Sequence, residues 1–146
     1  MGYTTEFQGE FNIDKPLSDE IYNLINGLNQ TRRMKRSGLS DKYGVEGEFY
    51  YGDGKDKQGG KIIDQNEPPS TQPSLWLNWK VLDDKQTIVW DEGEKFYHYV
   101  EWIGYLIESI LKPNGYIVNG EVDWVGEDVF DDGGTIVVKN NVITIY

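Results

Sequence analysis

The stretch DEGEKFYHYVEWIGYLIESILKPNGYIVNGEVDW, residues 91–124, decides the fold class of this chain. In its first part, apolar residues recur three and four positions apart, which is the period of one face of an α-helix. Asp91 and Glu94 match the D-x-x-E capping box, and Pro113 followed by Asn114-Gly115 is a stop signal. The pattern predicts a helix from Asp91 to just before Pro113. Its apolar stripe consists of Phe96, Val100, Ile103, Leu106, Ile107, Ile110 and Leu111, with Tyr99 and Trp102 on the margins.

The second part, residues 116–125, alternates between apolar and polar side chains, as a half-buried strand does. Val118, Val122 and Trp124 share one face, and the other face carries Asn119, Glu121 and Asp123. A capped helix followed by a one-sided strand indicates an α+β domain with a packed core.

Similar patterns extend this prediction over one domain, residues 1–146. They predict strands at residues 3–13, 75–82, 87–90, 135–139 and 142–146, a helix at about 18–34 that begins at Ser18, and a tight turn at Asn140-Asn141. Gly9 marks a bulge or a close contact in the first strand. The expected fold is two helices packed on one face of a mainly antiparallel sheet. Its order of elements resembles a ferredoxin-like split βαβ with an extra C-terminal hairpin.

Residues 37–74 interrupt this regularity with seven Gly and three Pro. Residues 46–51 and 61–64 are predicted to form a mobile β-hairpin insertion, because a structureless loop of this length is unusual in a compact domain. Long loops often carry function, although a surface excursion without function would have the same composition.

The composition excludes several classes of protein. The formal net charge is −11, which disfavours direct binding to nucleic acid or to an anionic membrane. Aromatic residues make up 14% of the chain, which argues against a disordered acidic tail. The chain has no Cys, and no apolar run approaches the roughly 20 residues that span a bilayer. We expect a cytoplasmic protein without a signal peptide, located in the host cytoplasm if a phage encodes it.

Catalytic motifs are absent from the sequence. His98 is the only histidine, and neither G-x-S-x-G nor a phosphate-binding G-x-x-x-x-G-K-[ST] occurs. Glu121 and Asp123 have a spacing that a retaining glycosidase could use, but both are expected on a solvated face, and acid catalysis needs a raised pKa. We therefore expect a non-enzymatic protein without a cofactor.

Cations gather in one place only. Arg32, Arg33, Lys35 and Arg36 lie at the predicted end of the first helix. They could complement the helix dipole, bind an anion such as a nucleotide, or pair with the acidic C-terminal half of the chain.

Acids gather near the C-terminus, within twelve residues and without a cation among them. These acids are Glu121, Asp123, Glu127, Asp128, Asp131 and Asp132. They could form a solvated face or hold a divalent cation, although the EF-hand pattern is not matched. They could also compete for a protein's basic groove by presenting carboxylates where phosphates would lie. The expected partner-binding residues are Asp123, Glu127, Asp128, Asp131 and Asp132, with Tyr50, Tyr51 and Trp76 as exposed aromatic anchors.

The chain also resembles a family of small hypothetical proteins of phages and bacteria. The resembling segments are residues 7–17, 31–36, 93–97, 99–102, 111–113, 119–122 and 126–128. That family has no assigned activity, so the resemblance transfers no functional residue. If the protein is phage-encoded, its small size and acidity resemble those of host-takeover and counter-defence proteins.

The leading hypothesis is therefore an acidic interaction protein that inhibits a host nucleic-acid-binding or defence protein through a basic surface of that partner. The alternative is a protein that sequesters a nucleotide or another anion at Arg32, Arg33, Lys35 and Arg36. A metal-dependent hydrolase built on the acidic cluster is a third hypothesis.

Overall fold

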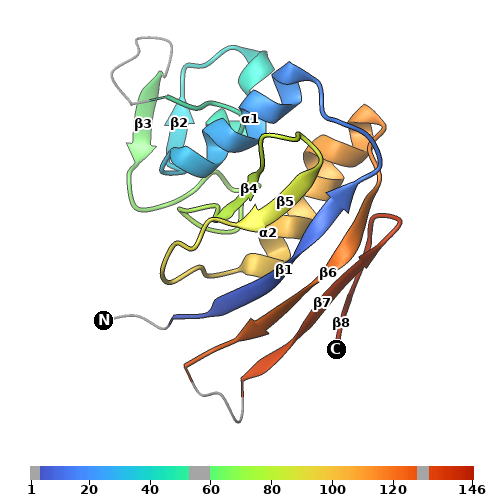
Figure 1. Cartoon of the computed structure of the whole chain (residues 1–146). Helices are drawn as coiled ribbons and strands as arrows, with labels where there is room; N and C mark the ends of the chain where they lie inside the picture. The colour runs from blue at the N-terminus through green and yellow to red at the C-terminus, as the bar shows by residue number, and fades with distance from the viewer. Residues whose placement is uncertain (1–3, 53–59, 128–131) are drawn as a thin grey trace.

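The computed structural model describes residues 4–52, 60–127 and 132–146. Its main element is a six-stranded sheet with the order β4-β5-β1-β6-β7-β8, in which every neighbouring pair is antiparallel (Figure 1). The strands are β1 (Glu6–Ile13), β4 (Trp79–Val81), β5 (Thr87–Trp90), β6 (Val118–Val125), β7 (Gly133–Lys139) and β8 (Val142–Ile145).

Two helices pack on one face of this sheet. They are α1 (Asp19–Gln30) and α2 (Tyr99–Tyr105), and α2 continues through a π-helical segment, Leu106–Leu111, and a 3-10 turn, Lys112–Asn114. One hydrophobic core joins Phe11 of β1, Ile25 of α1 and Ile103 of α2. The predicted α+β class is confirmed. The four strands β4-β5-β1-β6 and their two helices also follow the split βαβ order, and β7 and β8 extend it as a hairpin.

Two glycines, one on each central strand, allow the backbones of β1 and β6 to approach closely. Gly9 of β1 has a φ of 114° and pairs with Val122, and a Cβ there would overlap the carbonyl oxygen of Glu121. Gly120 of β6 has a φ of 142°, and a Cβ there would overlap the carbonyl oxygen of Glu10. The close contact predicted at Gly9 is confirmed, because only glycine allows this backbone approach.

Several predicted boundaries are also confirmed. Ser18 caps α1 by accepting a hydrogen bond from the backbone N–H of Ile21 at 3.3 Å. Gly115 ends the second helical region in the left-handed conformation, with a φ of 83°. Asn140 and Asn141 both have positive φ, as the predicted hairpin turn requires.

The predicted start of the second helix is wrong. α2 begins at Tyr99, and the preceding loop holds Glu92, Lys95 and His98 at positive φ, a conformation that no helix accommodates. Asp91 is not an N-cap. Its carboxylate accepts hydrogen bonds from the side-chain amide of Asn78, at 3.0 Å, and from the backbone N–H of Gly93, at 2.7 Å.

The insertion also differs from the prediction. Residues 61–64 do form a strand, β3 (Lys61–Asp64), but it pairs with β2 (Lys35–Ser37) in a separate two-stranded sheet. Residues 46–51 are not a strand: 3-10 turns occupy Asp41–Tyr43 and Val45–Gly47, and Glu46 has a φ of 54°. The strand expected at residues 75–82 is limited to Trp79–Val81.

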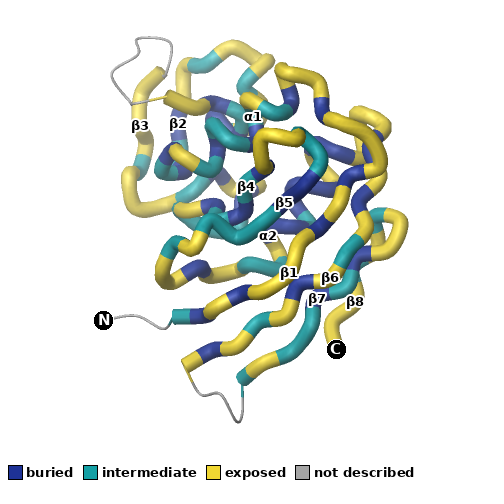
Figure 2. The backbone as a smooth tube through the Cα atoms, viewed as in Figure 1, coloured by how far each residue is buried: buried dark blue, intermediate teal, exposed yellow. Residues whose placement is uncertain are grey.

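The opposite face of the sheet is open to solvent. Exposed and buried residues alternate along β1 and β6, as Figure 2 shows, so that one side of each strand joins the core and the other side faces water. The residues that the structure describes include no helix that is long and apolar enough to cross a membrane.

Candidate functional site

Carboxylates line the open face of the two central strands. The register places Glu10 of β1 directly opposite Glu121 of β6, and Gln8 opposite Asp123. All four side chains are exposed, and Glu6 continues the same face of β1. Adjacent strands therefore bring together acids that lie more than a hundred residues apart in the chain.

None of the described ion pairs joins this row to a cation. The open-face positions of β1 and β6 hold no basic residue, and the ion pairs among the described residues lie elsewhere on the molecule. Asp123 accepts a hydrogen bond from the hydroxyl of Thr135 at 2.7 Å. Like charges that face each other across a strand pair destabilise a sheet, so the Glu10–Glu121 pair costs stability and contributes a negative field. We call Glu6, Glu10, Glu121 and Asp123 the acidic face.

The acidic C-terminal loop only partly joins this face. Glu127 is exposed and accepts a hydrogen bond from the backbone N–H of Thr4 at 2.8 Å. The carboxylate of Asp132 lies 3.4 Å from the indole nitrogen of Trp124, whose ring packs toward Tyr99 on the helical side. Asp128 and Asp131 lie outside the described residues. Of the predicted partner-binding residues, Asp123 is therefore the one that the structure places on the acidic face.

The described residues contain no group of three side chains that could hold a metal ion. This finding does not extend to Asp128 and Asp131, which complete the cluster on which the metal hypothesis rests. The structure adds Glu6 and Glu10 to the acidic row, and sequence alone did not single them out. The available signal was their alternation with Phe7 and Phe11, which places them on the polar side of the first strand.

The basic cluster is distributed over the interior and the rim of the insertion. α1 ends at Gln30 with no basic residue in its last turn, so the helix-dipole interpretation is wrong. Arg33 is 2% exposed, and burial lowers the pKa of its guanidinium to about 10. Arg36 is also buried and lies over the ring of Tyr50, 4.4 Å from its centroid.

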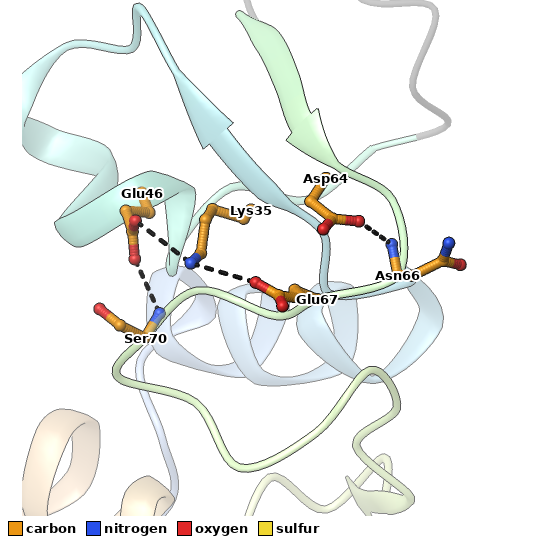
Figure 3. A network of polar contacts seen from close by, with 6 residues as sticks. All are labelled: Lys35, Glu46, Asp64, Asn66, Glu67 and Ser70. Atoms are coloured by element: carbon orange, nitrogen blue, oxygen red, sulfur yellow. Dashed lines mark hydrogen bonds and ion pairs between the residues drawn. The ribbon is translucent and has the colours of Figure 1, made fainter.

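The other members of the cluster contact acids and carbonyls of the insertion. Lys35 lies 3.8 Å from Glu46 and 3.5 Å from Glu67 (Figure 3). Glu46 also accepts a hydrogen bond from the backbone N–H of Ser70, which, with the nearby Lys35, lowers its pKa. Arg32 donates to the carbonyl of Gln65 at 3.0 Å. The described ion-pair partners of this cluster come from the insertion, and not from the acidic C-terminal half.

A buried polar network joins the insertion to α2. Arg33 donates to the Gln72 side chain at 3.2 Å and to the Glu48 carbonyl at 3.1 Å. The Tyr105 hydroxyl donates to the Glu48 carboxylate at 2.8 Å, and burial followed by this contact raises the pKa of Tyr105. These buried groups satisfy one another, so the network fixes the insertion to the helical layer. Tyr50, predicted to be an exposed anchor, is 2% exposed and belongs to this interior.

A groove of about 620 Å³ lies between the segment before β4 and the loop before α2. Trp76 and Tyr97 flank it with 45% and 47% of their surfaces exposed. Glu94, Lys95 and His98 supply its charged and titratable groups. Trp76 is exposed as predicted, and so is Tyr51, which lies elsewhere.

His98 occupies the position before the first turn of α2, in a left-handed conformation with a φ of 58°. Its imidazole is exposed and lies 3.5 Å from the carboxylate of Glu101, one turn along the helix. Among the described residues that line the groove, Ser74 is the one Ser or Thr, and its hydroxyl accepts a hydrogen bond from the indole of Trp102 at 2.8 Å. The described contacts of Ser74 and His98 therefore do not pair the hydroxyl with the imidazole, as an activated serine would require.

No family model, no curated protein and no solved structure matches this chain. The resemblance to small phage and bacterial proteins therefore stays a prediction, and function has to be argued from the surfaces described above.

Proposed function

We propose that this protein is a non-enzymatic interaction protein whose acidic face binds a basic surface of another protein. The observation that carries the proposal is the opposition of Glu10 and Glu121 on an exposed sheet face, with Gln8 opposite Asp123. A protein under selection for stability alone would separate such like charges, because each such pair weakens the sheet. A basic partner would turn this local cost into favourable contacts.

A sheet face suits this role because its backbone is fixed. β1 and β6 pair along their whole lengths, from Glu6–Val125 to Ile13–Val118, so the carboxylates project from a rigid platform. Preorganised charge loses little conformational entropy on binding and speeds the encounter with an oppositely charged protein. If the chain is phage-encoded, the partner we propose is a host nucleic-acid-binding or defence protein, in the host cytoplasm, whose basic groove normally faces phosphates.

The experiment that tests this proposal is affinity capture from a bacterial extract with the immobilised chain. The test variant combines Glu10→Gln, Glu121→Gln and Asp123→Asn. The matched control, Glu20→Gln with Asp41→Asn and Glu108→Gln, removes the same charge from exposed sites away from the acidic face.

We expect the test variant to lose its captured proteins and the control to keep them. Salt and added duplex DNA should both release the proteins, because salt screens exposed charges and phosphates compete for the same basic groove. Equal capture by the test variant and the unaltered chain would refute the proposal.

The groove beside Trp76 favours a second candidate, the binding of a small planar molecule such as a nucleotide. A volume of about 620 Å³ is typical of small-molecule sites, and an exposed indole offers a stacking surface. This candidate replaces the site predicted at Arg32, Arg33, Lys35 and Arg36, of which Arg33 and Arg36 are buried. Lys95 at the groove would face the phosphates.

A thermal-shift screen against nucleotides tests this second candidate. A ligand present at a hundred times its dissociation constant adds about 2.7 kcal/mol of stability. Trp76→Ala should abolish the shift, whereas Tyr51→Ala, which removes an exposed ring outside the groove, should preserve it. An absence of any shift across the panel would remove the candidate.

A further inference from the structure

We propose that the outer edge of β8 pairs with the same edge of a second copy of this chain, so that the sheet continues across a two-fold axis. An edge strand presents unpaired backbone groups that can template another strand. β8 is the last strand of the sheet, and its only sheet neighbour among the described residues is β7 (Figure 1).

The hydrogen-bond pattern identifies which groups face outward. Thr135 and Tyr146 exchange both backbone hydrogen bonds, at 3.0 and 2.9 Å. Since such pairs alternate along an antiparallel ladder, Thr144 and Val142 also point their backbone groups toward β7. The N–H and C=O groups of Ile143 and Ile145 therefore point away from the sheet.

The side chains of this edge lack the features that usually protect an edge strand. Residues 142–146, VITIY, contain no charge, no proline and no bulge. Val142 is 65% exposed, Ile145 46% and Tyr146 75%. Ile145 pairs with the buried Ile136 and so lies on the helical side of the sheet, where it extends the core to the open edge.

The opposite edge of the same sheet is protected. The outward N–H and C=O of Val81 bond to the side chain of Asn26, both at 2.9 Å. The amide of Asn29 donates to the carbonyl of Leu77, at 2.9 Å, and to that of Trp79, at 3.2 Å. Only one of the two edges is therefore available for strand addition.

A second copy is the occupant because the edge is self-complementary. When two β8 strands run antiparallel about an axis at Thr144, Ile143 of each copy meets Ile145 of the other, and each such pair exchanges two backbone hydrogen bonds. The uncharged segment lets two bodies of net charge −11 meet without charged side chains in contact. Pairing covers Ile145 and closes the edge, so association stops at the dimer. Both acidic faces then lie on one side of the continuous sheet.

Sedimentation velocity over a concentration series tests this inference with the full chain. We expect a monomer–dimer equilibrium that salt strengthens, because salt screens the repulsion between two acidic bodies. Binding of a basic partner at the acidic face has the opposite salt dependence, so the two proposals can fail separately.

Two variants probe the edge itself. Ile145→Pro deletes an outward N–H, and an edge strand tolerates proline at such a position. Ile145→Lys places a charge against the apolar Ile143 of the other copy. Both should be monomeric, with unchanged circular dichroism. Gln8→Lys adds the same charge to the acidic face and should still dimerise.

Amide hydrogen exchange locates the interface. In the dimer, the amides of Ile143 and Ile145 should become protected, whereas those of Val142 and Thr144, already bonded to β7, should change little. The inference is overturned if the unaltered chain stays monomeric at every concentration, if a dimer forms while Ile143 and Ile145 still exchange freely, or if both Ile145 variants dimerise normally.

Discussion

The two edges of the six-stranded sheet meet the same physical problem in opposite ways. At the β4 edge, α1 lies beside the strand, and two of its asparagines, Asn26 and Asn29, bond to the outward backbone groups of Val81, Trp79 and Leu77. At the β8 edge, the outward groups of Ile143 and Ile145 have no such partner among the described residues. The contrast shows that this chain can protect a sheet edge with side-chain amides, and that it does so on one side only.

The protected edge also depends on a second layer of contacts. The carboxylate of Asp91 accepts hydrogen bonds from the amides of Asn29, at 2.9 Å, and Asn78, at 3.0 Å. Asn29 is thereby held in the orientation in which it reaches the strand. Trp79 and Val81 of the β4 edge belong to the hydrophobic core, whereas Val142 and Ile145 of β8 are exposed.

The largest expected effect follows from removing the amides of the protected edge. Asn26→Ala with Asn29→Ala leaves the backbone groups of Val81 and the carbonyls of Leu77 and Trp79 without partners. Each site at which partly buried groups lose their partners costs about 1–3 kcal/mol. We therefore expect the free energy of unfolding to fall by about 2–5 kcal/mol. Urea denaturation measures this loss through the midpoint at a constant slope.

The matched control for this variant is Asn23→Ala, on the exposed side of the same helix, which should change stability by less than about 0.5 kcal/mol. A double variant as stable as the unaltered chain would show that water satisfies the β4 edge equally well.

The next effect concerns Asp91. Asp91→Ala removes the acceptor for Asn78, Asn29 and the backbone of Gly93, and we expect a loss of about 1–2 kcal/mol. Glu94→Ala is the informative control, because the capping-box prediction gives Glu94 a comparable role. A loss for Asp91→Ala alone supports the contacts described here, whereas equal losses would favour a cap in solution.

A smaller effect should appear on acidification of the turn between β4 and β5. The Asp84 carboxylate accepts hydrogen bonds from the Thr87 hydroxyl, at 2.6 Å, and from the backbone of Gln86, at 2.9 Å, and these contacts lower its pKa from the ordinary value of 3.8. A lowered folded-state pKa means that the stabilisation is fully present above the unfolded pKa and is lost as the pH falls through the folded one. The unaltered chain should therefore melt at a higher temperature than Asp84→Asn at neutral pH. This difference in melting temperature should disappear only below about pH 4.

The sequence predicted those features that local patterns determine. The alternation of residues 116–125 became β6, and the paired asparagines became the closing turn, because neighbouring residues specify both. The capping box failed because the Asp91 carboxylate bonds to the backbone of Gly93 and to the side chains of Asn78 and Asn29. The two asparagines are distant in sequence, so no local pattern could show these contacts.

The candidate site was predictable to the same extent. The sequence placed Glu121 and Asp123 on the polar face of their strand, and the structure confirms that both are exposed there. It could not place Glu10 opposite Glu121, because strand pairing over such a separation depends on the whole topology. It also could not show that Arg33 is enclosed by the insertion, since an arginine with buried partners has no sequence signature of its own.

The smallest expected effect comes from a comparison in which the same substitution, Val→Thr, is made on each edge of the sheet. Val142→Thr, at a position that is 65% exposed on β8, should change the stability of dilute protein by less than about 0.5 kcal/mol. Val81→Thr on β4 is its matched control, because Val81 is 3% exposed and the new hydroxyl enters the core, which costs about 1–3 kcal/mol. Urea titrations at low concentration measure both. If Val142→Thr is as costly as Val81→Thr in dilute solution, β8 is already covered in the monomer, and the bare edge that distinguishes the two sides of the sheet does not exist.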